Sequence, residues 1–212
     1  MPLPDFLINQ YKDWKENIFQ KKQDLYQSLV NKGQEPKAMI ISCCDSRVDA
    51  NQIFAANPGD FFIHRNVANL IPDLNINNTN HEITTSIDYA ILTLKIDRII
   101  ILGHSNCGGI DYAFNKFSDN NNNNESDSSL DKWIQSIKFS YDKVDKSQSK
   151  TDAIKSLEKE SIINSIKNLK NYKKIDKLIL DNKLQIHGLY FEISIGKITQ
   201  YDEISKKFEL IC

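Results

Sequence analysis

The sequence lacks the apolar runs that a membrane protein needs. Its longest apolar stretches are about five residues, whereas a spanning helix needs about 20. The N-terminal segment MPLPDFLINQYKDW also lacks the basic region and apolar stretch of a signal peptide. Neither charge is in excess, with 27 Lys and Arg against 28 Asp and Glu. This balance gives no support for nucleic acid or an anionic membrane as the main partner, so we expect a soluble, cytoplasmic protein.

Cysteine is scarce, with four residues at positions 43, 44, 107 and 212. In a chain without an export signal, so few cysteines favour metal binding or catalysis over a disulfide framework. The 212 residues are enough to bury one core. We expect an N-terminal helical arm over 1–32 and a single α/β domain over 33–212.

The hydrophobic pattern predicts alternating strands and helices, which is typical of an α/β fold with a mostly parallel central sheet flanked by helices. A low-complexity stretch, 118–129, is predicted to be a surface loop. The Lys-rich segment 152–174 is predicted to be a helix with a solvated face. The expected strands are 38–42, 61–64, 98–102, 184–187, 189–195 and 198–201, and the other expected helices are 5–30, 48–56 and 82–95.

Two polar segments follow directly on expected buried strands and carry the candidate metal ligands. Cys43 follows the first strand, and His104 and Cys107 follow the third. Ligand sites in open α/β sheets lie at the carboxyl ends of strands, so these loops can converge. The spacing of His104 and Cys107 predicts that their side chains lie on one face of a helical turn. Taken singly, each residue fits an ordinary role in the core. Three protein ligands that leave the fourth coordination position open are typical of a catalytic zinc site.

The remaining cysteines and histidines are assigned to other roles. Cys44 would point away from its neighbour and is expected to pack, and Cys212 is not expected to be a ligand. His64 and His187 lie on apolar strands and are expected in the core or an interface. His81 is expected at the surface.

Three segments together resemble the β-carbonic anhydrases. They are CCDSR at 43–47, FIHRNVANL at 62–70 and HSNCG at 104–108. The resemblance implies one zinc ion per subunit on Cys43, His104 and Cys107. It also implies an Asp45–Arg47 pair. The Asp45 carboxylate binds zinc in a closed state of the site, and it pairs with Arg47 in an open state.

The resemblance also implies a substrate pocket. Gln34, Phe62, Val67, Tyr89 and the Gly108 amide match the substrate-binding positions of the plant-like, type I subclass. The bicarbonate-regulated subclass carries a tryptophan where this chain has Ile40. Its later His-Gly-Trp-x-Tyr segment differs from HGLYF at 187–191, so the plant-like subclass is favoured.

The implied activity is the reversible hydration of carbon dioxide to bicarbonate by a zinc-bound hydroxide. Hydrolysis of a carbon dioxide analogue, such as carbonyl sulfide or carbon disulfide, and a non-catalytic zinc-binding role are the alternatives. Some eight apolar side chains on the N-terminal arm need a surface to cover them, and a two-fold partner is the commonest provider. Family members are dimers or tetramers, so a homodimer or a dimer of dimers is expected.

Overall fold

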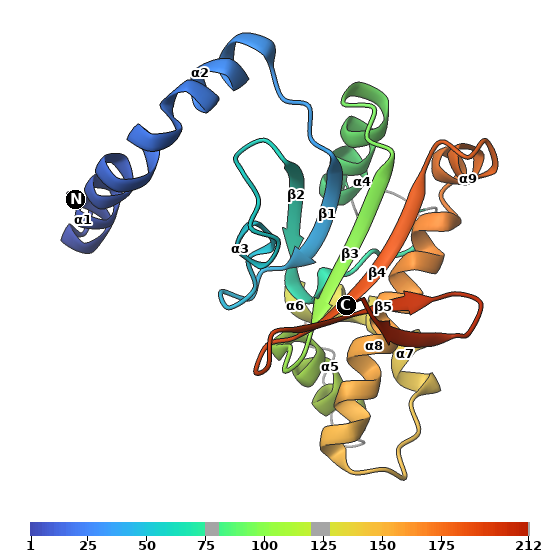
Figure 1. Cartoon of the computed structure of the whole chain (residues 1–212). Helices are drawn as coiled ribbons and strands as arrows, with labels where there is room; N and C mark the ends of the chain where they lie inside the picture. Colours follow the sequence, from blue (N-terminus) through green and yellow to red (C-terminus); the bar gives the residue numbers. More distant parts are fainter. Residues whose placement is uncertain (75–80, 120–127, 212) are drawn as a thin grey trace.

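A computed structural model describes residues 1–74, 81–119 and 128–211 (Figure 1). Its centre is a six-stranded sheet in the order β2-β1-β3-β4-β5-β6. The first four of these strands run parallel, and β5 and β6 complete the sheet as antiparallel neighbours. The predicted α/β fold with a mostly parallel sheet is therefore confirmed. The strands are β1 (Ala38–Cys43), β2 (Phe61–Asn66), β3 (Arg98–His104), β4 (Gln185–Glu192), β5 (Lys197–Asp202) and β6 (Lys207–Leu210).

Strand β1, in the middle of the parallel part of the sheet, is buried because its sequence AMIISC is almost entirely apolar. All six residues of β1 are buried. Met39 and Ile41 face a core built with helices α4, α8 and α9, while Ile40 faces the opposite side of the sheet. A strand that is covered on both faces needs apolar residues at successive positions, and this strand has them.

Helix α8 packs along β3 and β4. Its start is capped by Ser149, whose hydroxyl accepts the amide hydrogen of Asp152. The Lys-rich segment is thus helical as predicted, but one of its faces lies in the core. No helix within the described ranges is both long and apolar enough to cross a bilayer. The other helices are α3 (Ala50–Ile53), η3 (Val67–Asn69), α4 (His81–Asp88), η4 (Tyr89–Thr93), α5 (Gly108–Ser118), α6 (Ser129–Ile134), η5 (Gln135–Ile137), α7 (Lys138–Lys143), α8 (Lys150–Lys170) and α9 (Lys173–Leu180).

The N-terminal arm is helical and projects from the body of the molecule (Figure 1). It consists of α1 (Asp5–Trp14), η1 (Lys15–Phe19), η2 (Gln20–Lys22) and α2 (Gln23–Lys32). Gly33 ends it in the left-handed region, with φ at 83°. None of its residues is buried, although all are described. Its exposed apolar side chains include Phe6, Leu7, Tyr11, Ile18 and Val30.

Two features of the C-terminal half differ from the predicted elements. The predicted strands 184–187 and 189–195 correspond to one strand, β4, which runs through Gly188 and ends at Glu192, before a turn at 193–196. A Cβ at Gly188 would lie 2.6 Å from Ile166 Cδ1, so the glycine lets α8 approach the sheet without ending the strand. Strand β6 was not predicted. Most of the predicted 118–129 loop, at 120–127, lies outside the described residues.

Candidate metal centre

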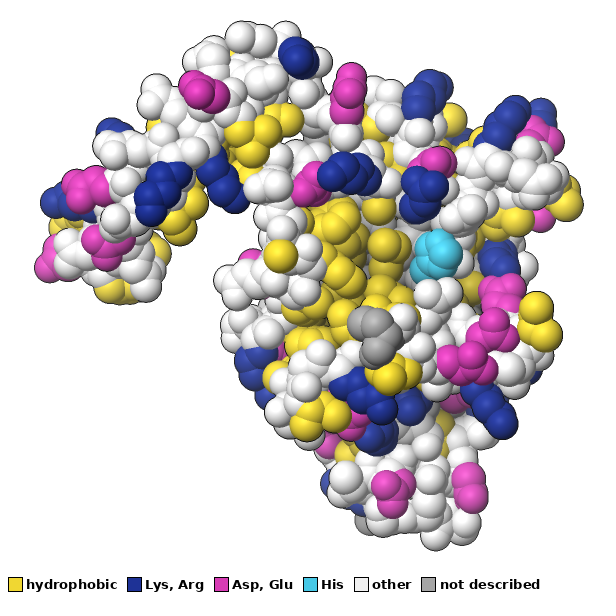
Figure 2. Space-filling model, in the orientation of Figure 1, with side chains coloured by type: hydrophobic (Ala, Val, Ile, Leu, Met, Phe, Trp, Pro, Cys, Tyr) yellow, Lys and Arg dark blue, Asp and Glu magenta, His cyan; other side chains and the backbone are white. Residues whose placement is uncertain are grey.

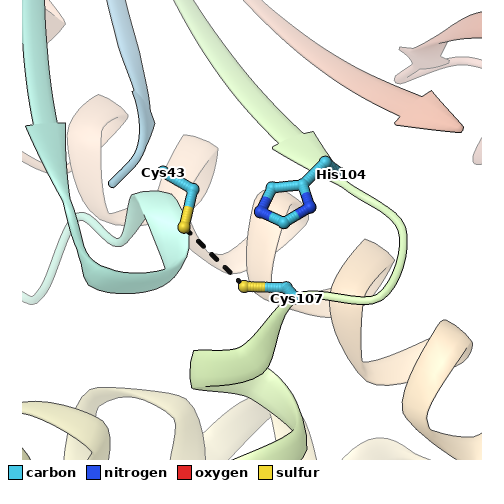
Figure 3. Close-up of side chains that lie close together, drawn as sticks. All are labelled: Cys43, His104 and Cys107. Atoms are coloured by element: carbon cyan, nitrogen blue, oxygen red, sulfur yellow. Dashed lines mark hydrogen bonds between the residues drawn. The ribbon is translucent and has the colours of Figure 1, made fainter. Parts of the chain in front are cut away.

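Three buried side chains converge at the carboxyl end of the parallel sheet (Figure 3). Cys43 is the last residue of β1, His104 is the last residue of β3, and Cys107 precedes α5. Their exposed fractions are 4%, 1% and 1%. Strands β1 and β3 are parallel neighbours, so their carboxyl ends lie at the same edge of the sheet.

The spacing of these side chains fits a shared metal ion. The Sγ atoms of Cys43 and Cys107 lie 3.9 Å apart, far beyond the roughly 2.05 Å of a disulfide bond. Two thiolates about 2.3 Å from a tetrahedral zinc ion would be about 3.8 Å apart. One ligand atom from each of the three residues lies within 4.8 Å of the other two. The group can therefore hold a metal ion without rearrangement.

His104 is oriented for ligation by its backbone environment. Its Nδ1 lies 2.9 Å from the carbonyl oxygen of Ser105, which fits an Nδ1–H donor and leaves the Nε2 lone pair free. Nε2 is buried and has no hydrogen-bond partner within the described part of the chain. A buried nitrogen without a partner destabilises the folded protein. A metal cation bound to Nε2 would give this nitrogen a partner.

The thiol groups of Cys43 and Cys107 shift each other's pKa in opposite directions. A hydrogen bond from Cys107 lowers the pKa of Cys43, and the same contact, with burial, raises the pKa of Cys107. A bound cation would stabilise both as thiolates. Backbone amides also act on the sulfurs: the Asp45 amide lies 3.4 Å from Cys43 Sγ, the Ala68 amide lowers the pKa of the same thiol, and the Ile110 and Gly109 amides act in the lowering direction on the pKa of Cys107.

The predicted helical turn containing His104 and Cys107 is wrong. His104 lies in a strand, and Cys107 has the extended φ and ψ of an N-cap. The chain reverses between them at Asn106, which has a φ of 56°. This reversal, rather than helical spacing, brings both ligands to the same point.

Asp45 and Arg47 form a bidentate pair beside the ligands. Arg47 Nε donates to Asp45 Oδ1 at 3.0 Å, and Nη2 donates to Oδ2 at 2.7 Å. This guanidinium holds the pKa of the Asp45 carboxyl well below its usual range. Oδ2 lies 3.9 Å from His104 Nε2. Arg47 Nη2 also donates to the Asn106 carbonyl at 2.9 Å, which links the two ligand-bearing loops.

Two residues of the site were missed by sequence reasoning. Arg65 donates to the carbonyl oxygens of Cys43, Asp45 and Val48 and so holds the loop after β1. Glu158 of α8 is buried, and its Oε1 accepts the amide hydrogen of Cys107 at 3.0 Å. A signal for Glu158 exists, because it lies four residues before Ile162 in an otherwise apolar row of the helix.

The predicted substrate residues form two separate groups within one chain. Val67 lies against Gly109, and Gly108 begins α5 next to the ligands. Phe62 and Tyr89 contact each other, with ring centroids 5.8 Å apart. Phe62 pairs in register with Met39, near the start of β1, and Gln34 precedes that strand. The length of β1, about 16 Å, separates this second group from the ligands.

The remaining predictions concern single cysteines and histidines. Cys44 is exposed, so the prediction that it packs in the core is wrong. It lines a cavity of about 710 Å³ together with His64 and Trp133. His64 and His187 are half-buried. The His64 Nδ1 lies 3.1 Å from Ser86 Oγ. Cys212 and the side chain of His81 lie outside the part of the chain that is described.

The comparisons with known proteins point to one family. The carbonic anhydrase family model matches residues 38–198. The chain is 34% identical over 164 residues to the mitochondrial β carbonic anhydrase 6 of Arabidopsis thaliana, covering 76% of this chain but 55% of that relative. It is 30% identical to a carbonic anhydrase of Synechococcus elongatus, covering 94% of this chain and 72% of the relative. The chain thus spans only part of the length of these relatives.

Solved structures show the same fold. The structure of the β-carbonic anhydrase CcaA superimposes with a TM-score of 0.85 at 28% identity, covering 97% of this chain and 98% of the other. A tetrameric β-carbonic anhydrase from Sordaria macrospora gives a TM-score of 0.78 at 27% identity, covering 92% and 95%.

Proposed function

This chain belongs to the β-carbonic anhydrases, and on that basis we propose that it catalyses the reversible hydration of carbon dioxide to bicarbonate and a proton. The convergence of Cys43, His104 and Cys107 carries the proposal. We propose that these residues hold one zinc ion per subunit. Zinc bound there supplies an acidified water as the nucleophile near neutral pH.

The Asp45–Arg47 pair gives the centre its open state. While Arg47 holds the carboxylate through two hydrogen bonds, Asp45 stays off the fourth ligand position and remains a hydrogen-bond acceptor beside it. Loss of that partner would release a carboxylate close to His104 Nε2. The pairing of Asp45 with Arg47 and the presence of Ile40 in place of tryptophan support the plant-like subclass.

The substrate pocket is proposed to form between two subunits. Carbon dioxide is uncharged, so its pocket should be small and apolar with a few placed donors. Val67 and the Gly108 amide lie at the metal end of the chain, whereas Gln34, Phe62 and Tyr89 lie at the other end. A second copy would supply the latter group to this centre.

Exposed apolar surface supports the same assembly. Figure 2 shows apolar side chains gathered over the sheet face that the large helices leave open, and further apolar side chains on the arm. Phe61, Ile63 and Ile100 contribute to this face and are half-buried. Burial of the arm on a partner would remove both surfaces from water. A homodimer, or a dimer of dimers like the tetrameric Sordaria macrospora proteins, follows from this arrangement.

Metal analysis combined with stopped-flow carbon dioxide hydration tests the proposal. We expect one zinc ion per chain and activity that rises from about pH 6.5 towards about pH 9, because two thiolates reduce the acidifying power of zinc. Cys43→Ala should lose metal and activity. The matched Cys44→Ala variant should keep both, since Cys44 lies outside the ligand group.

A wild-type chain without zinc, or a fully loaded chain without hydration activity, would overturn this function. The named relatives are all carbonic anhydrases, which does not favour the analogue hydrolase or the non-catalytic alternative.

A further inference from the structure

Helix α8 places a buried carboxylate directly behind the metal loop. Glu158 is 4% exposed. Its Oε1 accepts the Cys107 amide hydrogen at 3.0 Å, and its Oε2 accepts the Tyr190 hydroxyl at 2.7 Å. Both partners are donors, so the oxygens of Glu158 serve as acceptors here, and burial raises the pKa of the carboxyl group.

The cost of this arrangement indicates a role beyond packing. A buried carboxylate is normally paired with a cation, yet within the described residues no lysine or arginine forms an ion pair with Glu158. Tyr190 is also buried and directs its hydroxyl to the same carboxylate. An apolar side chain at position 158 would fill a core site at lower cost. What an apolar side chain would not supply is an acceptor for the Cys107 amide of the metal loop.

That hydrogen bond helps to fix where the Cys107 ligand lies, because the amide belongs to the ligand residue itself. Asn106, the residue before it, adopts a φ of 56° and turns the chain at this point. The Asn106 carbonyl on the opposite side accepts Arg47 Nη2 at 2.9 Å. The loop is thus held by Glu158 on one side and by Arg47 on the other.

We propose that Glu158, oriented by Tyr190, is a positioning residue that fixes Cys107 as a metal ligand and, through Asn106, sets the position of Arg47. The inference deepens the proposed function and rests on its metal centre. Glu158 touches neither substrate nor ligand sulfur, so its effect is transmitted through the backbone of the loop.

Metal affinity gives a readout independent of turnover. Zinc affinity is measured by chelator competition, and the Co²⁺-substituted protein is compared by its thiolate-to-metal absorption. Loss of outer hydrogen-bond partners typically weakens metal binding by about 10–100-fold. We expect that loss for Glu158→Gln, because one of its two acceptor oxygens becomes a donor. Tyr190→Phe should weaken binding several-fold, because it removes one orienting bond.

Glu160→Gln is the matched control. It makes the same charge change two residues along α8, at a residue that pairs with Lys143, and should bind both metals as the wild type does. Wild-type affinity and an unchanged Co²⁺ spectrum in both Glu158→Gln and Tyr190→Phe would overturn the inference. If the Glu158→Gln variant does not fold, the zinc affinity and Co²⁺ spectrum of the Tyr190→Phe variant alone test the inference.

The thermal midpoint of the metal-free variants separates positioning from general stability. A lowered midpoint with unchanged metal affinity in the folded protein would assign Glu158 to the core and overturn its positioning role. Failure of the wild type itself to bind zinc would instead overturn the proposed metal centre.

Discussion

Two adjacent glycines at the start of α5 should respond in opposite ways to the same substitution. A Cβ added to Gly109 would lie 2.7 Å from Val67 Cγ1 and 3.2 Å from Ala68 Cβ. A Cβ on Gly108 would meet no atom within 4 Å among the described residues. Neither glycine has a positive φ. Gly109→Ala and Gly108→Ala therefore differ in packing and not in backbone strain.

The expected shifts follow from these contacts. Val67 cannot easily retreat, because Trp133 Nε1 donates to its carbonyl at 2.9 Å and its β-branched side chain is stiff. Overpacking typically lowers the free energy of unfolding by about 1–3 kcal/mol. Replacing glycine by alanine raises it by about 0.4–1 kcal/mol where the backbone conformation suits alanine. Gly109→Ala should lower the melting temperature by up to about 10 °C, and Gly108→Ala should raise it by about 1–4 °C.

Thermal unfolding of the metal-free and zinc-loaded proteins, followed by circular dichroism, measures both shifts. Gly109→Ala should also weaken zinc binding, since it pushes Ala68, which belongs to the same buried cluster as Cys43 and Cys107. Equal melting temperatures for Gly108→Ala and Gly109→Ala would refute the packing argument. So would a Gly109→Ala protein more stable than the wild type.

Two further predictions concern the dyad and the arm. Arg47→Ala should keep zinc but lose hydration activity by at least about tenfold, because Asp45 loses its bidentate partner and can occupy the fourth ligand position; an active, zinc-loaded variant in stopped-flow assays would contradict this. Deletion of residues 1–30 should break the dimer, because the exposed apolar side chains of the arm are expected to cover a partner. Analytical ultracentrifugation measures the mass, and an unchanged oligomer after the deletion would exclude this role for the arm.

The central strands could be predicted because burial on both faces leaves a plain signature. Ile99, Ile100 and Ile101 follow one another in β3, and a run without polar residues fits a covered parallel strand. The sequence predicts two strands in place of β4, one on either side of Gly188, whereas the structure shows that Gly188 lies within one strand and allows the close approach of Ile166. Strand β6 escaped prediction because an exposed edge strand needs few apolar residues.

The metal ligands could be found from sequence, but their supports could not. Cys43 and His104 each end an apolar run, so the parallel fold alone brings them to one edge. Glu158 reaches the metal loop across 51 residues, and Arg65 reaches back 22 residues to the Cys43 carbonyl. Such hydrogen bonds depend on how α8 and β2 pack. The apolar row around Glu158 marks it as a buried position, but local spacing does not show which group it meets.

Two of the non-glycine residues with a positive φ lie beside the metal ligands. Ala68 and Asn106 have φ values of 64° and 56°, a region that costs an ordinary residue about 1–2 kcal/mol. The Ala68 amide lowers the pKa of the Cys43 thiol, and the turn at Asn106 precedes the Cys107 amide, which donates to Glu158. An amide that faces a thiolate withdraws charge from sulfur, which leaves a bound cation more electrophilic. The turn at Ala68 thereby offsets part of the charge that the Cys43 thiolate brings, so the cost of its conformation is tied to the acidity of the metal site.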